Sequence, residues 1–325
     1  MSGKYTVISL FAGGGGSSLG YEMAGFKELL AIEYDKNAIE TLKLNFDFDI
    51  WEKDITEIKD GEILKRCNIK KGELDILDGS PPCQGFSQSG KRVVNDLRND
   101  LYKNYVKILI DLKPKVFIME NVPGMAKGTM KGRFNEILKE LKSLNYNVKC
   151  KLMNAKYYNV PQSRERLIFI GVRKDLNMMP IFPQQNERII SIMESWKWMG
   201  LQKTPPLSKC FKGIVPMMKI GQTMADIIKK DIHAQTKRIY PNKPCPTIGK
   251  MICGIGFGAH IHPFEDRVLS IDEIKRVCSF PDDFILTGKY QEQKARLGNA
   301  VMPNMMKAIA EHIKVNILDK YYATR

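Results

Sequence analysis

Short apolar runs alternate with amphipathic segments over the first half of the chain. Runs of strand length, most of them rich in β-branched residues, occupy residues 6–11, 29–32, 74–78, 116–119 and 167–172. Segments with helical period lie at residues 17–23, 36–45, 100–112 and 134–144. Strands that alternate with helices are typical of βαβ units built around a parallel sheet. The pattern therefore predicts an α/β fold with an open sheet, in which the loops after the strands form a ligand site.

A glycine turn follows the first apolar run, at residues 11–16, and Ser17 is predicted to cap the next helix. Glycine lets the backbone approach a ligand closely at a helix amino terminus. Glu33 ends the second run some twenty residues later, where an acid can accept both hydroxyls of a ribose. Asp54 follows at the next loop, where it would meet an exocyclic amine. Each acid alone is more typical of a solvated loop than of a binding site, but as a series at successive strand ends they favour an adenosine-containing cofactor.

A second turn follows the run at residues 74–78 and contains Pro81, Pro82 and Cys83. Two prolines and the flanking glycines interrupt regular structure there, so Cys83 is predicted to lie on a turn at the carboxyl end of a strand. A cysteine held in this position is oriented as a nucleophile. The alternative is that Cys83 is a small buried thiol, as free cysteines more commonly are. A buried position, however, does not require the sequence Ser-Pro-Pro that precedes Cys83.

Charged residues also follow later apolar runs. Glu120 ends the run at residues 116–119, in the same row as Cys83 if the two strands are neighbours. Arg164 and Arg166 alternate at the start of the run at residues 167–172, so an extended backbone would direct both to one face. A pair of guanidinium groups suits a phosphate or a polarised carbonyl. The alternatives are a helix-capping role for Glu120 and a surface ladder of Arg164 and Arg166 with Glu165.

Composition narrows the class of protein. The chain has 325 residues, 43% of them hydrophobic, and a formal net charge of +15. Excess lysine and arginine favour a polyanionic partner such as nucleic acid, although spread lysines also occur on ordinary solvated surfaces. No apolar run is long enough to cross a bilayer and no signal segment is evident, so we expect a cytoplasmic protein. Seven cysteines without a C-x-x-C pair are expected to be reduced.

The alternation of strands and helices ends near residue 175, and prolines become frequent from there to residue 246. We therefore predict three segments: a catalytic domain at residues 1–175, a smaller irregular domain at 176–284, and a return to the catalytic domain at 285–325. Cys245, Cys253, His260 and His262 lie in or next to the irregular part. They lack the spacing of zinc ligands, so no metal is predicted.

Residues 79–87, Gly-Ser-Pro-Pro-Cys-Gln-Gly-Phe-Ser, resemble the catalytic motif of the DNA cytosine-5 methyltransferases. Further family motifs follow in the family's order: the glycine turn, Glu-Asn-Val at 120–122, Gln-x-Arg-x-Arg at 162–166, and Gly-Asn-Ala-Val at 298–301. The four successive glycines depart from the family, which usually has one bulkier residue there. The resemblance implies a Rossmann-like, S-adenosylmethionine-dependent catalytic domain with a target recognition domain, of the bacterial restriction-modification type.

The resemblance also implies roles for individual residues. Cys83 would attack carbon 6 of a flipped-out cytosine, with Glu120 at ring nitrogen 3 and Arg164 and Arg166 beside them. The implied cofactor residues are Phe11, Ala12, Gly13, Gly14, Gly15, Gly16, Glu33, Tyr34, Asp54, Ile55, Pro82, Leu101, Asn299 and Ala300. The implied DNA contacts are Ser87, Ser89, Lys91, Gln162, Gly254, Gly256 and Phe257. The substrate would be double-stranded DNA bound by a monomer, and a restriction endonuclease acting separately is a candidate partner.

Three other functions fit part of this pattern. One family branch methylates tRNA and carries a Cys-Phe-Thr signature, but this chain has Cys210-Phe211-Lys212 and departs at the third position. A catalytically silent DNA-binding regulator would not need Cys83 and Glu120. A nicotinamide-dependent oxidoreductase would explain the glycine turn but not the turn at Cys83.

Overall fold

The computed structural model describes residues 5–82, 101–126, 131–229, 236–250 and 260–324. Its contacts divide the chain into two units, both discontinuous in sequence. Unit 1 comprises Met1–Asn154, Glu165–Gln184 and Met305–Arg325, and unit 2 comprises Ala155–Arg164 and Gln185–Asn304. The predicted boundaries at residues 175 and 284 thus differ from these divisions. Residues 155–164, which join β6 to β8, pack with unit 2.

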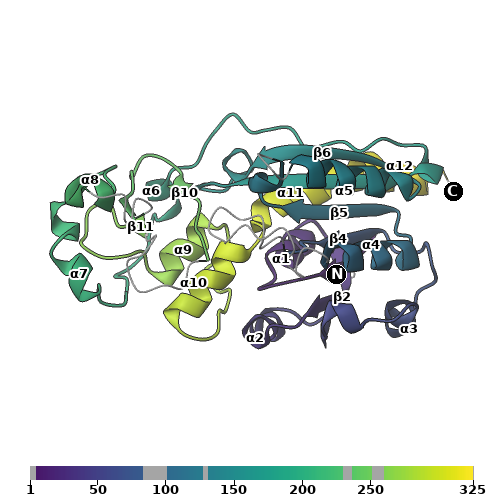
Figure 1. Cartoon of the computed structure of the whole chain (residues 1–325), viewed down its shortest axis with the longest axis horizontal. Helices are drawn as coiled ribbons and strands as arrows, with labels where there is room; N and C mark the ends of the chain where they lie inside the picture. Colours follow the sequence, from purple (N-terminus) through teal and green to yellow (C-terminus); the bar gives the residue numbers. More distant parts are fainter. Residues whose placement is uncertain (1–4, 83–100, 127–130, 230–235, 251–259, 325) are drawn as a thin grey trace. The chain divides into compact units, whose positions relative to one another are not determined.

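Unit 1 is built on a seven-stranded sheet, as the alternating pattern predicted (Figure 1). The strand order is β3-β2-β1-β4-β5-β8-β6. The strands are β1 Tyr5–Leu10, β2 Phe26–Glu33, β3 Asp49–Glu52, β4 Ile76–Gly79, β5 Val116–Asn121, β6 Tyr146–Asn154 and β8 Glu165–Arg173. Strands β3, β2, β1, β4 and β5 are parallel, whereas β8 runs antiparallel to both of its neighbours. The α/β fold is confirmed.

The strand order reverses direction between β1 and β4. After β1 the chain adds β2 and β3 on one side of this strand, and it then adds β4 and β5 on the other side. Ligands of open α/β sheets bind at such a reversal, beyond the carboxyl ends of the strands. The glycine turn leaves the end of β1 and the Pro81-Pro82 turn leaves the end of β4. Both predicted turns therefore begin at the reversal point.

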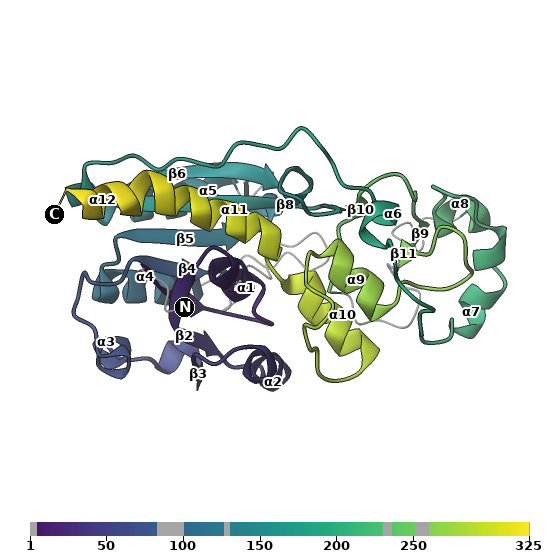
Figure 2. The ribbon, with the colours of Figure 1, turned by 180° about the vertical axis from the view of Figure 1, so that it is seen from behind.

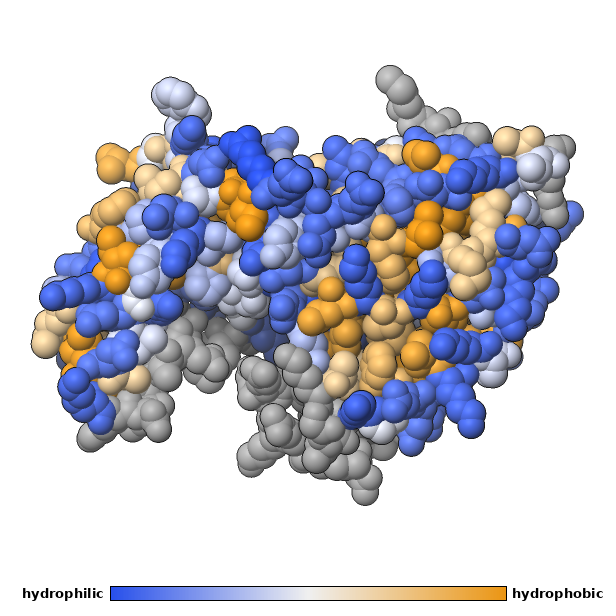
Figure 3. Space-filling view, turned by 90° about the horizontal axis from the view of Figure 1, so that it is seen from above, coloured by the Kyte–Doolittle hydropathy of each residue, from blue (hydrophilic) through white to orange (hydrophobic). Residues whose placement is uncertain are grey.

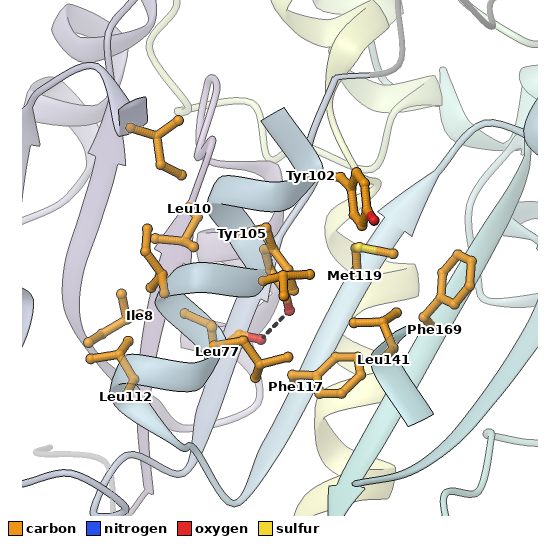
Figure 4. Packing of buried hydrophobic residues seen from close by; sticks show 14 of the residues in the cluster. Ile8, Leu10, Leu77, Tyr102, Tyr105, Leu112, Phe117, Met119, Leu141 and Phe169 are labelled. Carbon is orange, nitrogen blue, oxygen red and sulfur yellow. Dashed lines mark hydrogen bonds between the residues drawn. The ribbon is translucent and has the colours of Figure 1, made fainter. Parts of the chain in front are cut away.

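Helices cover both faces of the sheet. Helices α4 (Leu101–Leu112) and α5 (Lys131–Ser143) lie on one face, and α1 (Gly16–Met23) and α11 (Pro303–Ile313) lie on the other (Figures 1 and 2). Figure 4 shows Tyr105 of α4 packed against Leu77 and Phe117, where its hydroxyl donates to the Leu77 carbonyl at 3.4 Å. It also donates to the Ile118 carbonyl at 3.0 Å. The buried phenol therefore has acceptors within the sheet, which burial of a polar group requires.

The other helices of unit 1 complete this frame. They are α2 Lys36–Asn45, α3 Glu62–Cys67, the π-helical turn Lys314–Leu318 and α12 Asp319–Ala323. Helix α12 is bonded to the sheet, because Tyr5 of β1 donates to Asp319, and Tyr322 donates to Asp75, next to β4, at 2.7 Å. Among the described residues, no helix is both long and apolar enough to cross a membrane.

One local prediction in unit 1 was wrong. Ser17 does not cap α1, because the N-cap residue is Gly15, which has a left-handed φ of 83° and makes no side-chain cap bond. A Cβ at Gly15 would come within 2.5 Å of the Phe46 ring. Glycine is thus required there by conformation and by space, and Ser17 lies inside the first turn of the helix.

Unit 2 has short elements joined by long loops. Its helices are α6 Ile192–Ser195, α7 Lys209–Lys212, α8 Met224–Ile228, α9 Ile271–Val277 and α10 Tyr290–Asn299. Its strand pairs are β7 Gln162–Ser163 with β10 Cys245–Pro246, and β9 Lys237–Arg238 with β11 His260–Ile261. Helix α9 begins at a complete capping box, which Ser270 and Glu273 form.

Hydrophilic side chains are distributed over the face shown in Figure 3 rather than gathered in one place. This agrees with the dispersion of lysine along the sequence. On this face, the distribution of hydrophilic side chains therefore does not mark a binding surface.

Candidate active site

The glycine turn after β1 has an unusual backbone that faces open space. Phe11 and Gly13 both have positive φ, 55° and 56°. A Cβ built at Gly13 would meet no heavy atom within 4 Å among the described residues. The turn therefore leaves room for a ligand to approach the main chain at the start of α1.

Glu33 holds the adjoining loops together at the end of β2. Its side chain is buried, and Oε2 accepts a bond from the Gly13 amide at 2.7 Å. Oε1 accepts bonds from the amides of Tyr34 at 2.9 Å and Asp35 at 3.0 Å. A carboxylate has about four acceptor positions, so the structure leaves room for about one further donor. Tyr34 lies next to this carboxylate and is 68% exposed.

Asp54 lies at the same edge of the sheet. The amide of Lys53 donates to the Glu33 carbonyl at 3.0 Å, which joins the loop after β3 to the end of β2. Asp54 caps the short helix Ile55–Glu57 by accepting from the Thr56 amide at 2.8 Å and its hydroxyl at 2.7 Å. Ile55 is buried beneath it. Glu33, Tyr34 and Asp54, which the sequence assigned to one cofactor, are thus near one another.

The turn that precedes Cys83 in the sequence is bonded to β5 at Pro81. Asn121 donates from Nδ2 to the Pro81 carbonyl at 3.3 Å, and its Oδ1 accepts from the Val122 amide at 2.9 Å. The end of β5 is therefore tied to the turn that leads to the cysteine. Several predicted site residues lie outside the described residues: Cys83, Ser87, Ser89, Lys91, Gly254, Gly256 and Phe257. Pro82 and Leu101, which border the first gap, are both partly exposed.

Glu120 and Arg166 form an ion pair at the carboxyl end of β5. Arg166 Nε lies 2.6 Å from Glu120 Oε1, and the side chains are only 12% and 10% exposed. Arg166 Nη1 also donates to the Glu165 carbonyl at 2.7 Å. Burial lowers the pKa of Arg166, while the charge of Glu120 acts in the opposite direction. The predicted neighbourhood of Glu120 and Arg166 is therefore present.

Arg164 does not join Arg166 in the expected pair. Its guanidinium is buried in unit 2, where Nη1 donates to the Ile248 carbonyl at 3.0 Å and Nη2 to the Gly298 carbonyl at 2.8 Å. The reason is a break in the extended chain at Arg164, between β7 and β8. The catalytic assignment of Arg164 stays a prediction, while the observed contacts give it a role in joining two segments of unit 2.

The remaining predicted residues also lie in unit 2. Gln162 is fully buried, its Nε2 donates to the Val277 carbonyl at 3.3 Å, and its Oε1 accepts from the Ile248 amide at 3.1 Å. Its assigned contact with DNA stays a prediction, for which the side chain would have to leave these partners. Asn299 is exposed at the end of α10, and Ala300 follows it as a buried C-cap residue.

Sequence reasoning missed an acid beneath the two turns. Asp78 of β4 is 3% exposed and accepts a hydrogen bond from the Tyr21 hydroxyl of α1 at 3.2 Å. Burial raises its pKa to about 7, and the charge of Glu120 acts in the same direction. The signal in the sequence was an acid inside an otherwise apolar strand, directly before the Gly79 turn.

Nothing in the described part of the chain gathers three or more metal-ligating side chains. Cys245 is buried, and burial lowers the pKa of His260 to about 3, so that imidazole is neutral. Cys253 lies outside the described residues.

These features define a class of protein: an α/β fold in which a glycine turn of the nucleotide-binding type and a second turn at Pro81-Pro82 leave two neighbouring strands, β1 and β4. The particular family follows from comparison with known proteins. A model of the C-5 cytosine-specific DNA methylases matches residues 5–315, and the chain belongs to that family. The protein is a DNA (cytosine-5) methyltransferase, and the resemblance in its sequence motifs is confirmed.

Relatives cover nearly the whole chain. The Type II methyltransferase M.FnuDI of Fusobacterium nucleatum is 43% identical over 97% of this chain and 95% of its own length. The Type II methyltransferase M1.HphI of Haemophilus parahaemolyticus is 33% identical over 95% of this chain and 86% of its own. A putative DNA modification methyltransferase encoded within an Escherichia coli prophage has a similar structure. Its TM-score is 0.81 at 24% identity, and the match covers 97% of this chain and 100% of that one.

Proposed function

We propose that this chain transfers a methyl group from S-adenosylmethionine to carbon 5 of a flipped-out cytosine within a short specific sequence of double-stranded DNA, through a covalent bond to Cys83. The observation that carries the proposal is the Glu120–Arg166 ion pair at the end of β5. The adjacent Asn121 is bonded to the turn that leads to Cys83. The carboxyl group of Glu120 and the thiol of Cys83, which follows β4 in the sequence, are the two groups that this chemistry requires.

The residues around the glycine turn fit S-adenosylmethionine. The open backbone at Gly13 suits the amino-acid part of such a ligand, and Glu33 retains about one acceptor position for a ribose hydroxyl. Tyr34 offers an exposed ring for the adenine, and Asp54 lies where an exocyclic amine can be bound. S-adenosylmethionine, when bound, supplies the methyl group. The contribution of Asn299 and Ala300 is part of this proposal.

Cytosine carbon 5 is a poor nucleophile until a thiolate adds to carbon 6. Cys83 makes that bond, and the electron pair of the 5,6 double bond then becomes available at carbon 5. Glu120 holds a proton at ring nitrogen 3, so that negative charge does not accumulate on the ring. Arg166 keeps the Glu120 carboxyl group in place. After methylation, loss of the carbon 5 proton restores the double bond as Cys83 leaves.

The target base has to leave the duplex for this reaction, at a cost of a few kcal/mol. Ser87, Ser89 and Lys91, close to Cys83 in sequence, are assigned to the DNA around the extruded base. Unit 2 is the proposed target recognition part. Its candidate contacts are Gln162 and the segment containing Gly254, Gly256 and Phe257. The net charge of +15 supports binding to the phosphate backbone.

We assign the biological role from the relatives, which are named Type II methyltransferases. The modification would protect specific sites from a restriction endonuclease that acts as a separate protein. The methyltransferase would act as a monomer, because a single copy contains all the groups named above.

Bisulfite sequencing of plasmid DNA from cells that express the chain tests the proposal, with Cys83→Ala as the matched variant. Protected cytosines in one short recurring sequence, absent with Cys83→Ala, are the expected result. Methylation that survives the Cys83→Ala change would remove Cys83 from the mechanism. Protection in neither sample would contradict DNA methylation under these conditions, and transfer of labelled methyl groups to tRNA would then identify the other substrate class.

A further inference from the structure

A network of buried polar groups lies between the sheet and helix α1. Asp78 on β4 and Glu28 on β2 are its two acids, and both are buried. The Tyr21 hydroxyl donates to Asp78 Oδ1 at 3.2 Å, and the Ser18 hydroxyl donates to Glu28 Oε1 at 3.1 Å. Ser17 also forms a side-chain hydrogen bond with Asp78. Helix α1 is thus joined to two strands through carboxyl groups.

Asp78 occupies a particular place in this network. It lies one residue before Gly79, from which the turn to Cys83 begins, and it pairs in register with Ser9 of β1. Its partner Ser17 lies in the first turn of α1, directly after the glycine turn. The Asp78 carboxyl group therefore links two parts of the site. It contacts α1, which follows the glycine turn, and it belongs to β4, which precedes the turn at Pro81-Pro82.

The groups that act on Asp78 are acids, phenols and hydroxyls. Tyr21 and Ser17 come from α1, Glu28 from β2 and Glu120 from β5. Tyr105 of α4 interacts with it from the other face of the sheet. Burial raises the pKa of Glu28 to about 8, so Glu28 is mostly neutral at pH 7. Asp78, with a pKa of about 7, exchanges its proton in the neutral range.

We propose that Asp78 is a positioning and selectivity residue of the cofactor site, which fixes α1 against β4 and whose carboxylate favours the cationic methyl donor over the reaction product. The proposal rests on the proposed use of S-adenosylmethionine. Methyl transfer converts a positively charged sulfonium into a neutral thioether, so donor and product differ by one positive charge. A buried carboxylate beneath the glycine turn attracts the positively charged donor and has no charge attraction to the neutral thioether of the product.

This arrangement links donor binding to a proton. A nearby cation lowers the pKa of a carboxyl group, because it stabilises the ionised form. The donor complex then holds fewer protons than the free enzyme, and the affinity for the donor rises as pH rises towards 7 and above. A shift of about one pKa unit corresponds to about a tenfold change in affinity. The neutral product gives no such linkage through Asp78.

The test measures equilibrium binding of S-adenosylmethionine and S-adenosylhomocysteine to the full chain by calorimetry between pH 5.5 and pH 8. Wild-type protein is expected to bind the donor about three- to tenfold more tightly at the upper end, while the product shows no such gain. Repetition near pH 6.5 in buffers of different ionisation enthalpy counts protons, and release is expected with the donor but not with the product. The proton count requires only wild-type protein.

Asp78→Asn keeps an acceptor oxygen for Tyr21 and removes the charge. It is expected to lose the pH dependence of donor affinity and to bind donor and product more equally. Asp75→Asn is the matched control, because Asp75 is also a buried acid but lies at the opposite end of β4, where it pairs with Lys115 at 3.1 Å. It should retain the wild-type difference.

Three results would overturn the assignment: equal proton release with both ligands, no release with the donor, or a pH dependence that persists in Asp78→Asn. If both ligands bind with the same pH dependence, only the role of Asp78 fails. If neither S-adenosylmethionine nor S-adenosylhomocysteine binds, the proposed use of this cofactor is wrong as well as the role of Asp78.

Discussion

Glu120 at the end of β5 and Arg166 at the start of β8 face each other across an antiparallel strand pair, with 2.6 Å between Oε1 and Nε. The two residues are 46 positions apart in sequence. Glu120 pairs with Ile168 in the sheet register, and Arg166 directly precedes Leu167, which pairs with Asn121. The ion pair is held by the sheet rather than by a loop. A carboxyl group supported in this way keeps one orientation before a substrate arrives, as the role proposed for Glu120 requires.

Arg166→Gln should therefore slow methyl transfer without unfolding the protein. We expect the single-turnover rate to fall by about 100-fold, because Glu120 loses the cation that orients it. Donor affinity should stay close to that of wild type. Rapid-quench measurement of labelled methyl transfer, with calorimetric donor binding on the same samples, checks both statements.

Arg173→Gln is the control for this change. Arg173 lies on the same strand at its other end, where Nε bonds to Asp175 at 2.7 Å. The Arg173→Gln change should reduce the stability of the protein and leave the methyl-transfer rate of the folded protein unchanged. Equal rate losses in the two variants would show that the effect of Arg166 is structural.

The strands of the sheet followed from local sequence. β-Branched runs predicted the parallel strands, because a buried strand needs apolar residues on both faces. The sequence likewise placed Glu33 and Glu120 at strand ends, since each directly follows an apolar run, and it placed Asp54 in the next loop.

Features that depend on distant contacts did not follow from sequence. Gly15 rather than Ser17 caps α1 because the Phe46 ring occupies the space that a Cβ would need. Arg164 bonds to carbonyls more than 80 residues away, so the alternation with Arg166 misdirected its placement. Asp78 was missed because a single acid in a strand does not reveal that Tyr21 and Ser17 face it.

Gly171→Ala tests the packing of β8 against β5. Gly171 pairs with Phe117 in the sheet register, and a Cβ at Gly171 would overlap the Phe117 ring. Phe117 is fully buried, as Figure 4 shows, so the ring has little room to move. We expect a loss of about 1–3 kcal/mol in the free energy of unfolding, measured by urea titration.

Gly200→Ala is the control for Gly171→Ala, because it adds the same methyl group where no described atom lies close by. A Cβ at Gly200 meets no heavy atom within 4 Å among the described residues. Its effect should stay within about 0.5 kcal/mol. If Gly171→Ala is equally mild, the ring of Phe117 does not have the position described.

Ser270→Ala tests the cap of α9 in unit 2. The Ser270 hydroxyl accepts a bond from the Glu273 amide at 3.0 Å, and the Ser270 amide donates to Glu273 Oε2 at 2.7 Å. Alanine at this position should cost about 1 kcal/mol of stability, whereas glycine, which is tolerated at N-caps, should cost only a few tenths. Thermal unfolding of the two variants decides the point. Equal losses would show that the hydroxyl stabilises through Gln202, to which it donates at 2.7 Å, rather than through the cap.

Glu28→Gln should change how stability depends on pH. Burial raises the pKa of Glu28 to about 8 from its ordinary value of 4.5. Between these values the folded protein holds a proton that the unfolded chain releases, so the contribution of Glu28 to stability falls as pH rises through this window. Glutamine has the shape of the neutral acid and cannot ionise. The variant should be close to wild type at pH 5 and more stable than wild type at pH 8.

Urea unfolding at pH 5 and pH 8 measures this difference, which we expect to reach the order of a few kcal/mol at the higher pH. Glu22→Gln is the control, because Glu22 is an acid of the neighbouring helix α1 with an exposed side chain. Its variant should show a much smaller change between the two pH values. If Glu28→Gln alters stability by the same amount at pH 5 and pH 8, Glu28 does not carry a proton in the folded protein. The carboxyl network beneath the cofactor turn would then be ionised, and Asp78 would have an anionic neighbour in place of a neutral one.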